Sequence, residues 1–599
     1  MKSVEEFLSY ISDLDIKLYV DGDRLRCNAP KQTLTPEIRT QLAERKAEIL
    51  EFLNQANFSD RKSVNYQPFP EIVARPDERY KPFPLTDIQQ AFWLGRKGDF
   101  ELSNVSTHAY MEIDSVDLDL ERLEKAWQQL IDRHDMLKAI VQPDGQQQIL
   151  EQVPAYKIKV LDLRGKESEL AACELNQLRE QLSHQVLPAD QWPLFEIRAA
   201  QLDDNKVRLY ISFDLLIGDA WSFETILGQL VQLIQNREAS LPGLELSFRD
   251  YVLAEINLRN SQLYQRSKEY WLNRIPTLPP SPELPLQKNP AAIAHPRFLR
   301  RSGKLDSDTW ERLKKRASLA NLTPSGLLLA AFAEILTLWS KTPKFTINLT
   351  LFNRLPLHPQ VNQIVGDFTS LTLLTVDNSG EDSFEVRSRR IQKQFWDDFD
   401  HRYFSGVQVL RQLARIQKRH LGMFVPVVFT STLINDSLSR DQASAKFASI
   451  SSLGEVAYML TQTPQVYLDH QVSEQAGTLI FSWDAVEELF PAGLLDDMFS
   501  SYCNFLERLA VEEQLWQAPT RQLLPPAQLE QLVAINTTDT PVPQAALLHS
   551  LFFEQAELQP QQVAVVTTGR TLTYTELSTR AYQLAYQLRQ LGAVPNQLV

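Results

Sequence analysis

Two aspartates and a serine lie at the end of an apolar stretch, ISFDLLIGDAWS (211–222). The apolar run predicts a buried strand, and Asp214 and Asp219 close it before a helix expected to begin near Ser222. Carboxylates at the end of a buried strand must be paired or hydrogen-bonded, because burying an isolated charge is costly. Two such acids could perform general acid–base chemistry. If the two aspartates are considered without the rest of the sequence, a structural role is favoured over a catalytic one. One or both acids would then form an ion pair with an arginine.

Five further segments combine polar, aromatic and glycine residues in motif-like patterns. They are FPLTDIQQAFWLGR (83–96), RHDML (133–137), GDFTSL (366–371), PVVFTS (426–431) and TQTPQVYLDHQ (461–471). All six segments resemble, in the same order, the motifs of heterocyclization domains of nonribosomal peptide synthetases. The stretch at 211–222 is similar to their DxxxxDxxS signature, with Asp214, Asp219 and Ser222 in its three named positions.

One residue in this stretch separates two related kinds of domain. Condensation domains, the relatives of heterocyclization domains, carry HHxxxDG at this place, and Asp214 and Leu215 occupy the two histidine positions. Leu215 has no proton to exchange. The histidine base of condensation domains is therefore expected to be absent.

The resemblance implies that ring closure depends on Thr430 of PVVFTS and Asp469 of TQTPQVYLDHQ. Closing the ring requires a thiol or hydroxyl to attack an amide carbonyl, after which water leaves. A carboxylate can take the proton of the nucleophile and return it to the departing hydroxyl, while a threonine hydroxyl orients it or binds the developing oxyanion. Outside this context, Thr430 would be interpreted as a strand residue and Asp469 as a helix cap or an ion pair.

A second group of residues is expected around this pair. By analogy with condensation domains, Arg354 of TLFNRLP should pair with Asp219 and connect two lobes. The main role of Asp219 would then be structural rather than catalytic. Its neighbour Asn353 would reach into the channel and hydrogen-bond a substrate carbonyl. Gln465, with Gln462, would line the acceptor side.

Two isolated histidines have more conservative interpretations than catalysis. His134 in RHDML is expected to be a packing element at a helix end, and His470 either orients Asp469 or hydrogen-bonds the backbone. Neither has a serine or cysteine partner at nucleophile-like spacing, so a hydrolase triad is set aside.

Composition excludes several other classes of protein. The net charge of −14 and the lack of a basic stripe argue against nucleic-acid binding. Cys27, Cys173 and Cys503 are too far apart for a disulfide framework or a metal site, which favours a reducing cytoplasm and no metal. The start of the chain does not resemble a secretory signal. The apolar run at 326–339 is too short for a membrane span and predicts a buried helix.

The elements that must position these residues fall into several units. Residues 1–57 predict a small module with a hairpin around Asp21-Gly22 and flanking helices, followed by a linker at 58–80. Strands and helices then alternate, with a first lobe at 81–275 and a second at 276–515, divided near the proline-rich TLPPSPELPLQKNP. A linker at 516–545 precedes a helix–strand–strand–helix pattern at 546–599. The resemblance implies an α/β fold of two chloramphenicol-acetyltransferase-like lobes, forming a V with a central channel.

Both ends of the chain resemble parts of an assembly line. The first module resembles docking domains of the tubulysin type, in which basic residues receive an acidic tail of the upstream protein; Arg24, Arg26 and Lys31 are the candidate contacts. The last segment, with LTYTEL (572–577), resembles the opening of an adenylation domain. Because it contains no glycine-rich phosphate loop, this segment should not activate an amino acid.

The resemblance therefore predicts condensation of a carrier-bound acyl donor with carrier-bound Cys, Ser or Thr, and then cyclodehydration to a thiazoline or oxazoline. The domain itself would bind no cofactor, because phosphopantetheine arrives on the partner carrier proteins. Other expected partners are an upstream docking tail and a downstream adenylation domain, without nucleic acid or membrane. Two alternatives stay open: a condensation domain that stops at the amide, and a scaffold that binds carriers without chemistry.

Overall fold

The computed structural model describes residues 72–98, 101–236, 239–417, 425–433, 452–519, 523–539 and 549–595, with strands at 17–21 and 24–28 and a few single positions outside these ranges. Two compact units, Met1–Pro525 and Pro526–Val599, divide the chain. The first contains every segment in which chemistry is expected.

The predicted N-terminal hairpin is confirmed. Strands β1 (Lys17–Asp21) and β2 (Arg24–Asn28) are antiparallel, with Asp21 opposite Arg24. Arg24 and Arg26 thus share one strand. Lys31 and the helix expected before the hairpin lie outside the described residues.

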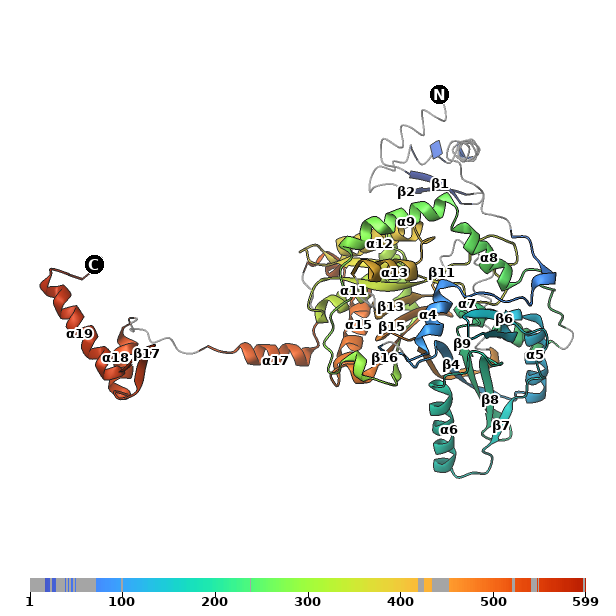
Figure 1. Ribbon diagram of the computed structural model, residues 1–599, viewed down its shortest axis with the longest axis horizontal. Helices are drawn as coiled ribbons and strands as arrows, with labels where there is room; N and C mark the ends of the chain where they lie inside the picture. The colour runs from blue at the N-terminus through green and yellow to red at the C-terminus, as the bar shows by residue number, and fades with distance from the viewer. Residues whose placement is uncertain are drawn as a thin grey trace. The chain divides into compact units, whose positions relative to one another are not determined.

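The first lobe is built on a five-stranded sheet in the order β14-β4-β9-β8-β7. Its strands are β4 (His108–Val116), β7 (Lys159–Asp162), β8 (Phe195–Gln201), β9 (Lys206–Asp214) and β14 (Glu455–Gln462). Helices α5 (Leu120–Arg133) and α7 (Ala220–Gln235) contact each other and share one apolar core with β8 and β9, whereas α6 (Ser168–Ser183) contacts β4 and β9. Helix α4 (Asp87–Gly95) and a small sheet of β3 (Phe83–Pro84), β6 (Gln146–Ile149) and β5 (Ala139–Val141) complete this lobe. Figure 1 shows its position below the second lobe.

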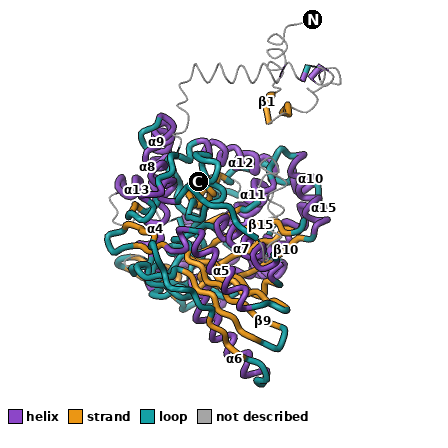
Figure 2. Tube along the Cα trace, turned by 90° about the vertical axis from the view of Figure 1, so that its right-hand side faces the viewer, coloured by secondary structure: helices purple, strands orange, loops and turns teal. Residues whose placement is uncertain are grey.

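The second lobe is built on a six-stranded sheet in the order β10-β16-β15-β13-β11-β12. The strands are β10 (Phe298–Leu305), β11 (Lys344–Phe352), β12 (Thr369–Asp377), β13 (Val427–Ser431), β15 (Leu468–Gln475) and β16 (Thr478–Val486). Helices α8 (Phe248–Leu258) and α9 (Gln262–Arg274) come between the two sheets in sequence, and α12 (Phe384–Asp400) and α13 (Gly406–Gln417) contact β12. Helices α10 (Ser307–Leu319), α11 (Pro324–Trp339) and α15 (Leu494–Val511) pack together in a group that is visible in Figure 2.

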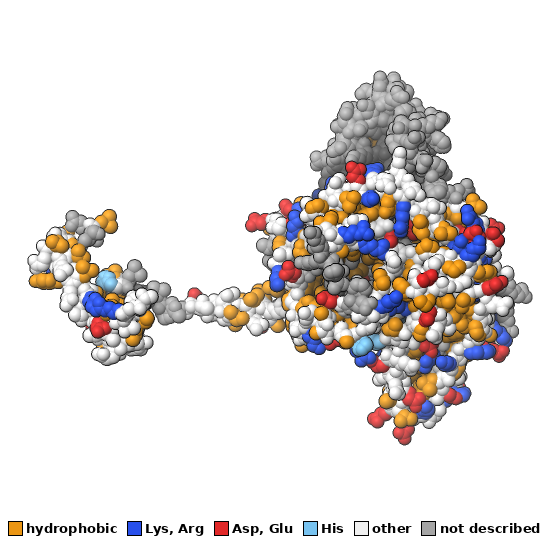
Figure 3. Space-filling view, viewed as in Figure 1, with side chains coloured by type: hydrophobic (Ala, Val, Ile, Leu, Met, Phe, Trp, Pro, Cys, Tyr) orange, Lys and Arg blue, Asp and Glu red, His pale blue; other side chains and the backbone are white. Residues whose placement is uncertain are grey.

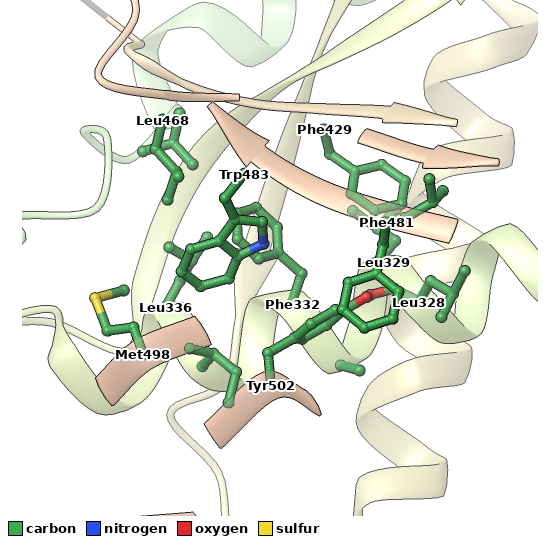
Figure 4. Packing of buried hydrophobic residues seen from close by; sticks show 14 of the residues in the cluster. Leu328, Leu329, Phe332, Leu336, Phe429, Leu468, Phe481, Trp483, Met498 and Tyr502 are labelled. Atoms are coloured by element: carbon green, nitrogen blue, oxygen red, sulfur yellow. The ribbon is translucent and has the colours of Figure 1, made fainter. Parts of the chain in front are cut away.

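The apolar run at 326–339 forms the buried helix that the sequence predicts. Every residue of α11 from Gly326 to Leu336 is buried. Figure 4 shows Phe332 of this helix beside Trp483 of the sheet and Tyr502 of α15. Helices α11 and α15 therefore cover one face of the six-stranded sheet, and the polar side chains of its strands are left for the other face.

Two predicted boundaries are wrong. Strand β14 lies beyond residue 276, yet it pairs with β4 in the first lobe's sheet, because a single chain can return to an open sheet edge late in its sequence. The linker does not begin at 516: Trp516, in the short helix α16 (Gln514–Gln517), is buried against the second lobe's core, where its indole N–H donates to the Leu509 carbonyl.

The second unit follows the predicted pattern. After helix α17 (Pro526–Asn536), it contains α18 (Ser550–Leu558), strands β17 (Val563–Thr567) and β18 (Arg570–Thr573), and α19 (Tyr574–Gln590).

Among the described residues, no single helix has the length and apolar character needed to cross a membrane. Helices α10 and α11 reach that length only as a pair, bent by 95°. On the face shown in Figure 3, Lys and Arg side chains are interspersed with Asp and Glu.

Candidate active site

A central cavity of about 1660 Å³ separates the polar face of the second lobe's sheet from the first lobe. Thr430, Asp469 and Gln465 line it, together with Leu215 and Asp219 from the first lobe. With Phe92 and Thr369 also in its lining, the cavity collects residues from five of the six motif segments.

Strand registers place a row of polar side chains across the floor of this cavity. Thr350 of β11 lies beside Thr430 of β13, Thr430 beside Gln471 of β15, Gln471 beside Ser482 of β16, and Ser482 beside Ser302 of β10. All five residues line the cavity. Alternation along β15 also brings Asp469, two residues before Gln471, to the same face.

Thr430 and Asp469 are close enough to interact. The Thr430 hydroxyl donates to Thr350 Oγ1 at 2.9 Å, and Asp469 Oδ1 is an alternative acceptor at 3.4 Å. A hydroxyl can rotate between two acceptors, so the pair is adjustable. The second carboxylate oxygen of Asp469, Oδ2, accepts a hydrogen bond from the Gln471 amide at 2.6 Å.

The surroundings of Asp469 weaken its acidity. Burial raises its pKa to about 7, assisted by the charge of Asp484; the Gln471 hydrogen bond, Arg300 and Thr430 act in the opposite direction. Asp469 borders the cavity and is partly exposed to it, although protein encloses the site. A carboxyl group with such a pKa can both accept and release a proton near neutral pH.

Four residues around Asp469 were not predicted to belong to the site: Arg300, Thr461, Gln471 and Asp484. Arg300 Nε donates to Asp484 Oδ1 at 2.7 Å, and Arg300 also donates to Gln471 Oε1 at 3.3 Å. The Thr461 hydroxyl donates to Asp484 at 2.6 Å. Gln471 ends the TQTPQVYLDHQ motif and could have been selected there. Arg300 and Asp484 lie outside the six segments and 184 positions apart, so only strand pairing brings them together.

Asp214 is fully engaged in the first lobe. Its carboxylate pairs with Arg96 and accepts from the Ser106 hydroxyl at 2.7 Å and the Leu216 amide at 2.9 Å. It is 1% exposed, so no oxygen faces the cavity. Its contacts are those of a structural residue.

Asp219 connects the two halves of the chain, as the sequence predicts. It is the N-cap of α7, where it accepts from the Ser222 amide at 2.7 Å and the Ser222 hydroxyl at 2.6 Å. The expected ion pair with Arg354 is present at 2.9 Å. The Gly366 amide donates to the Ser222 hydroxyl oxygen at 3.1 Å, so DxxxxDxxS and GDFTSL join at this point.

No histidine is found among the described residues that line the cavity, where the first lobe presents Leu215. His134 is buried at the end of α5 against Gln229, as expected of a packing residue, and burial lowers its pKa to about 4. His470 points away from Asp469, among Phe332, Phe429, Trp483 and Tyr502, and burial lowers its pKa to about 3. Its Nδ1 contacts the Ser482 carbonyl at 3.2 Å, so the backbone alternative holds.

Two predicted positions need correction. Asn353 is not among the cavity-lining residues: it is only 9% exposed, and its carbonyl accepts a hydrogen bond from the Tyr251 hydroxyl, which holds this segment at the junction with α8. Gln462 is buried against His108. Gln465 does line the cavity, in a turn with φ of 62° where its amide donates to the Leu102 carbonyl at 3.0 Å.

Within the described residues, no group of three or more His, Cys, Asp or Glu side chains could hold a metal ion. Of the carboxylates at the cavity, Asp219 accepts from Arg354 and Ser222, and Asp469 accepts from the Gln471 amide.

Comparisons with known proteins give two matching family models and several relatives of this chain. The condensation-domain family model matches residues 80–533, and the TubC N-terminal docking-domain model matches residues 4–55. Pyochelin synthetase PchF of Pseudomonas aeruginosa is 34% identical over 99% of this chain and 31% of its own length. Phenyloxazoline synthase MbtB of Mycolicibacterium paratuberculosis is 36% identical over 86% of this chain and 43% of its own length. The chain thus spans less than half of these curated relatives.

A solved structure matches over nearly its whole length. The EpoB cyclization-docking bidomain from Sorangium cellulosum is 41% identical, with a TM-score of 0.73, and the match covers 85% of this chain and 98% of that one. The matched family model covers most of the chain, and both structural lobes lie within it. This chain therefore belongs to the condensation-domain family, as a member of the cyclization type preceded by a docking domain.

Proposed function

We propose that this chain joins a carrier-bound acyl or peptidyl donor to carrier-bound Cys, Ser or Thr, and then cyclodehydrates the new amide to a thiazoline or oxazoline. The observation that carries this proposal is the Thr430–Asp469 pair facing a cavity whose described lining contains no histidine. Relatives named for cyclization and for phenyloxazoline synthesis support it.

Amide formation is the first step. The amine of the acceptor attacks the donor thioester, the new C–N bond forms, and the donor arm leaves as a thiol. With Leu215 at the wall, no imidazole assists from this position. We attribute the step to the alignment of two arms in one cavity, since holding reactants together supplies much of such a barrier.

Ring closure is the second step, and it requires proton transfer at one site. The acceptor's thiol or hydroxyl attacks the amide carbonyl, and its proton passes to Asp469. The carboxyl group returns that proton to the carbonyl oxygen, which becomes a hydroxyl. The proton of the amide N–H then passes through Asp469 to this hydroxyl, so that water leaves as the C=N bond forms. Thr430, beside Oδ1 of Asp469, is positioned to orient the tetrahedral intermediate.

The two alternatives make different products. A plain condensation domain yields the amide alone, and a scaffold yields nothing. With Cys and an acyl donor loaded on carrier proteins, product mass separates all three, because ring closure removes a second water.

Asp469→Asn is the decisive variant. It keeps the volume and the Gln471 contact but has no exchangeable carboxyl proton, so we expect amide product with azoline formation reduced by about 100-fold or more. Asn353→Ala is a matched control, because Asn353 is buried outside the cavity lining. Azoline formation by Asp469→Asn at the wild-type rate would contradict the assignment of Asp469 to ring closure.

The partners follow from this function. Phosphopantetheine would arrive on donor and acceptor carrier proteins, with the domain binding no cofactor of its own, in the cytoplasm. Arg24, Arg26 and Lys31 would contact an upstream docking tail. Residues 546–599 would open an adenylation domain, which their LTYTEL segment supports.

A further inference from the structure

We propose that Gln471 is a positioning residue for ring closure, held in one orientation by Arg300 and Asp484 so that it binds Oδ2 of Asp469 and leaves Oδ1 for Thr430 and the substrate. This inference rests on the proposed function. It concerns three residues outside the pair that the sequence motifs assign to the chemistry.

The direction of each hydrogen bond in this group is fixed by chemical type. Arginine can only donate, and an ionised aspartate can only accept. Arg300 donates to both oxygens of Asp484 and also to Gln471 Oε1. The amide oxygen of Gln471 must therefore face Arg300, and its NH₂ group must face Asp469.

Thr461 completes this hydrogen-bonded group, and its own hydrogen bonds are compatible with the orientation of the Gln471 amide. Its hydroxyl donates to Asp484 Oδ2 at 2.6 Å, so a lone pair is free to accept from Gln471 Nε2 at 2.5 Å. The second N–H of Gln471 donates to Asp469 Oδ2 at 2.6 Å. Both amide protons are used, and a flipped amide would turn its oxygen toward two acceptors.

This order determines where Asp469 carries its proton. Because Oδ2 accepts the Gln471 hydrogen bond, protonation falls on Oδ1, the oxygen 3.4 Å from Thr430 Oγ1. A proton taken from the nucleophile is thus held on the side from which it must be returned. Without Gln471, either oxygen could carry it.

Within the described part of the chain, two charged groups act on this carboxylate, Arg300 of β10 and Asp484 of β16. The same two charges act on the hydroxyl of Tyr458 in β14. Asp484 is fully buried and paired with Arg300, and His470, next to Asp469 on β15, lies on the opposite face. Gln471 is therefore the neutral link between a buried ion pair and Asp469.

The test is Gln471→Met in the complete chain, with carrier-loaded Cys and acyl donor, measuring amide and azoline separately across pH. We expect amide formation near wild type and ring closure slowed about tenfold to 100-fold, as for loss of a hydrogen bond to a charged group. The rising pH limb of ring closure should move to higher pH, because the Gln471 hydrogen bond lowers the pKa of Asp469. Equal loss of both steps with an unmoved pH limb, or no change at all, would overturn the proposal.

Two further variants make the result decisive. Gln201→Met places the same substitution in β8, away from the cavity, and should change neither step. Arg300→Lys keeps a positive charge near Asp484 but loses the planar fork that also reaches Gln471, so it should shift the pH limb in the same direction. If Gln471→Met does not fold, Arg300→Lys is judged by the same criteria.

Asp469→Asn in the same assay separates the two proposals. If it still closes the ring, the assignment of Asp469 is wrong. If it stops ring closure while Gln471→Met and Arg300→Lys behave as wild type, only the positioning role fails.

Discussion

Asp469 is an acid whose two oxygens have different surroundings, one bound to an amide and the other beside a hydroxyl at the cavity. A solvent-exposed aspartate would be too weak a base and, once protonated, would lose its proton too readily for a reversible transfer at neutral pH. Burial corrects this by disfavouring the charged form.

A pH dependence follows for ring closure. The ionised carboxylate must accept the first proton, and burial raises the pKa of Asp469 to about 7. Ring closure should therefore rise with pH to half its maximum near pH 7, whereas amide formation should lack this limb. Single-turnover measurements of both products between pH 5 and pH 9 would test this; a limb shared by both steps would contradict it.

Strand β14 couples the two lobes at the scale of elements. It pairs with β4 of the first lobe, yet carries Thr461, which contacts Asp484 and Gln471 of the second lobe's sheet. A shift of β14 would therefore disturb both the wall of the cavity and the surroundings of Asp469.

Gly454 allows β14 to begin at this place. Its φ is 150°, and a Cβ atom there would lie 2.2 Å from the Asp114 carbonyl oxygen of β4. We expect Gly454→Ala to lower the thermal unfolding midpoint of the first unit by several degrees and to reduce both product-forming steps, because the clash is with backbone. Gly243→Ala, where nothing lies within 4 Å, is the matched control and should unfold as wild type.

The two units of the molecule differ in how many of their apolar side chains are buried. The first has apolar cores in both lobes, whereas among described residues 549–595 only Ala556 is buried. Leu551, Val566, Tyr582 and Tyr586 are exposed. A unit with so little buried apolar surface has little to stabilise it alone.

Removal of residues 526–599 should therefore leave amide formation, ring closure and the main unfolding transition within about twofold of the full chain. The isolated segment 526–599 should show no cooperative thermal transition by circular dichroism. Loss of ring closure on truncation would mean that the second unit contributes to the active site.

The sequence alone determined the elements and the family of this protein, because both depend on local patterns. The apolar run around Phe332 predicts a buried helix wherever it packs, and the motif residues Thr430, Asp469 and Asp219 stand in recognisable short strings. The ion pair of Arg354 with Asp219 could also be predicted from the sequence, because both segments resemble known motifs.

Only the tertiary structure decided what surrounds Asp469. Arg300, Thr461, Gln471 and Asp484 meet because β10, β16 and β15 are neighbours and β14 crosses to the other lobe, and such pairings over nearly two hundred residues leave no local pattern. The same packing removed Asn353 from the cavity and turned His470 to the apolar face, since alternation along a strand sends neighbouring residues to opposite sides. The sequence motifs identify Asp469 as the acid. The surrounding strands determine its pKa and which of its two oxygens carries the proton.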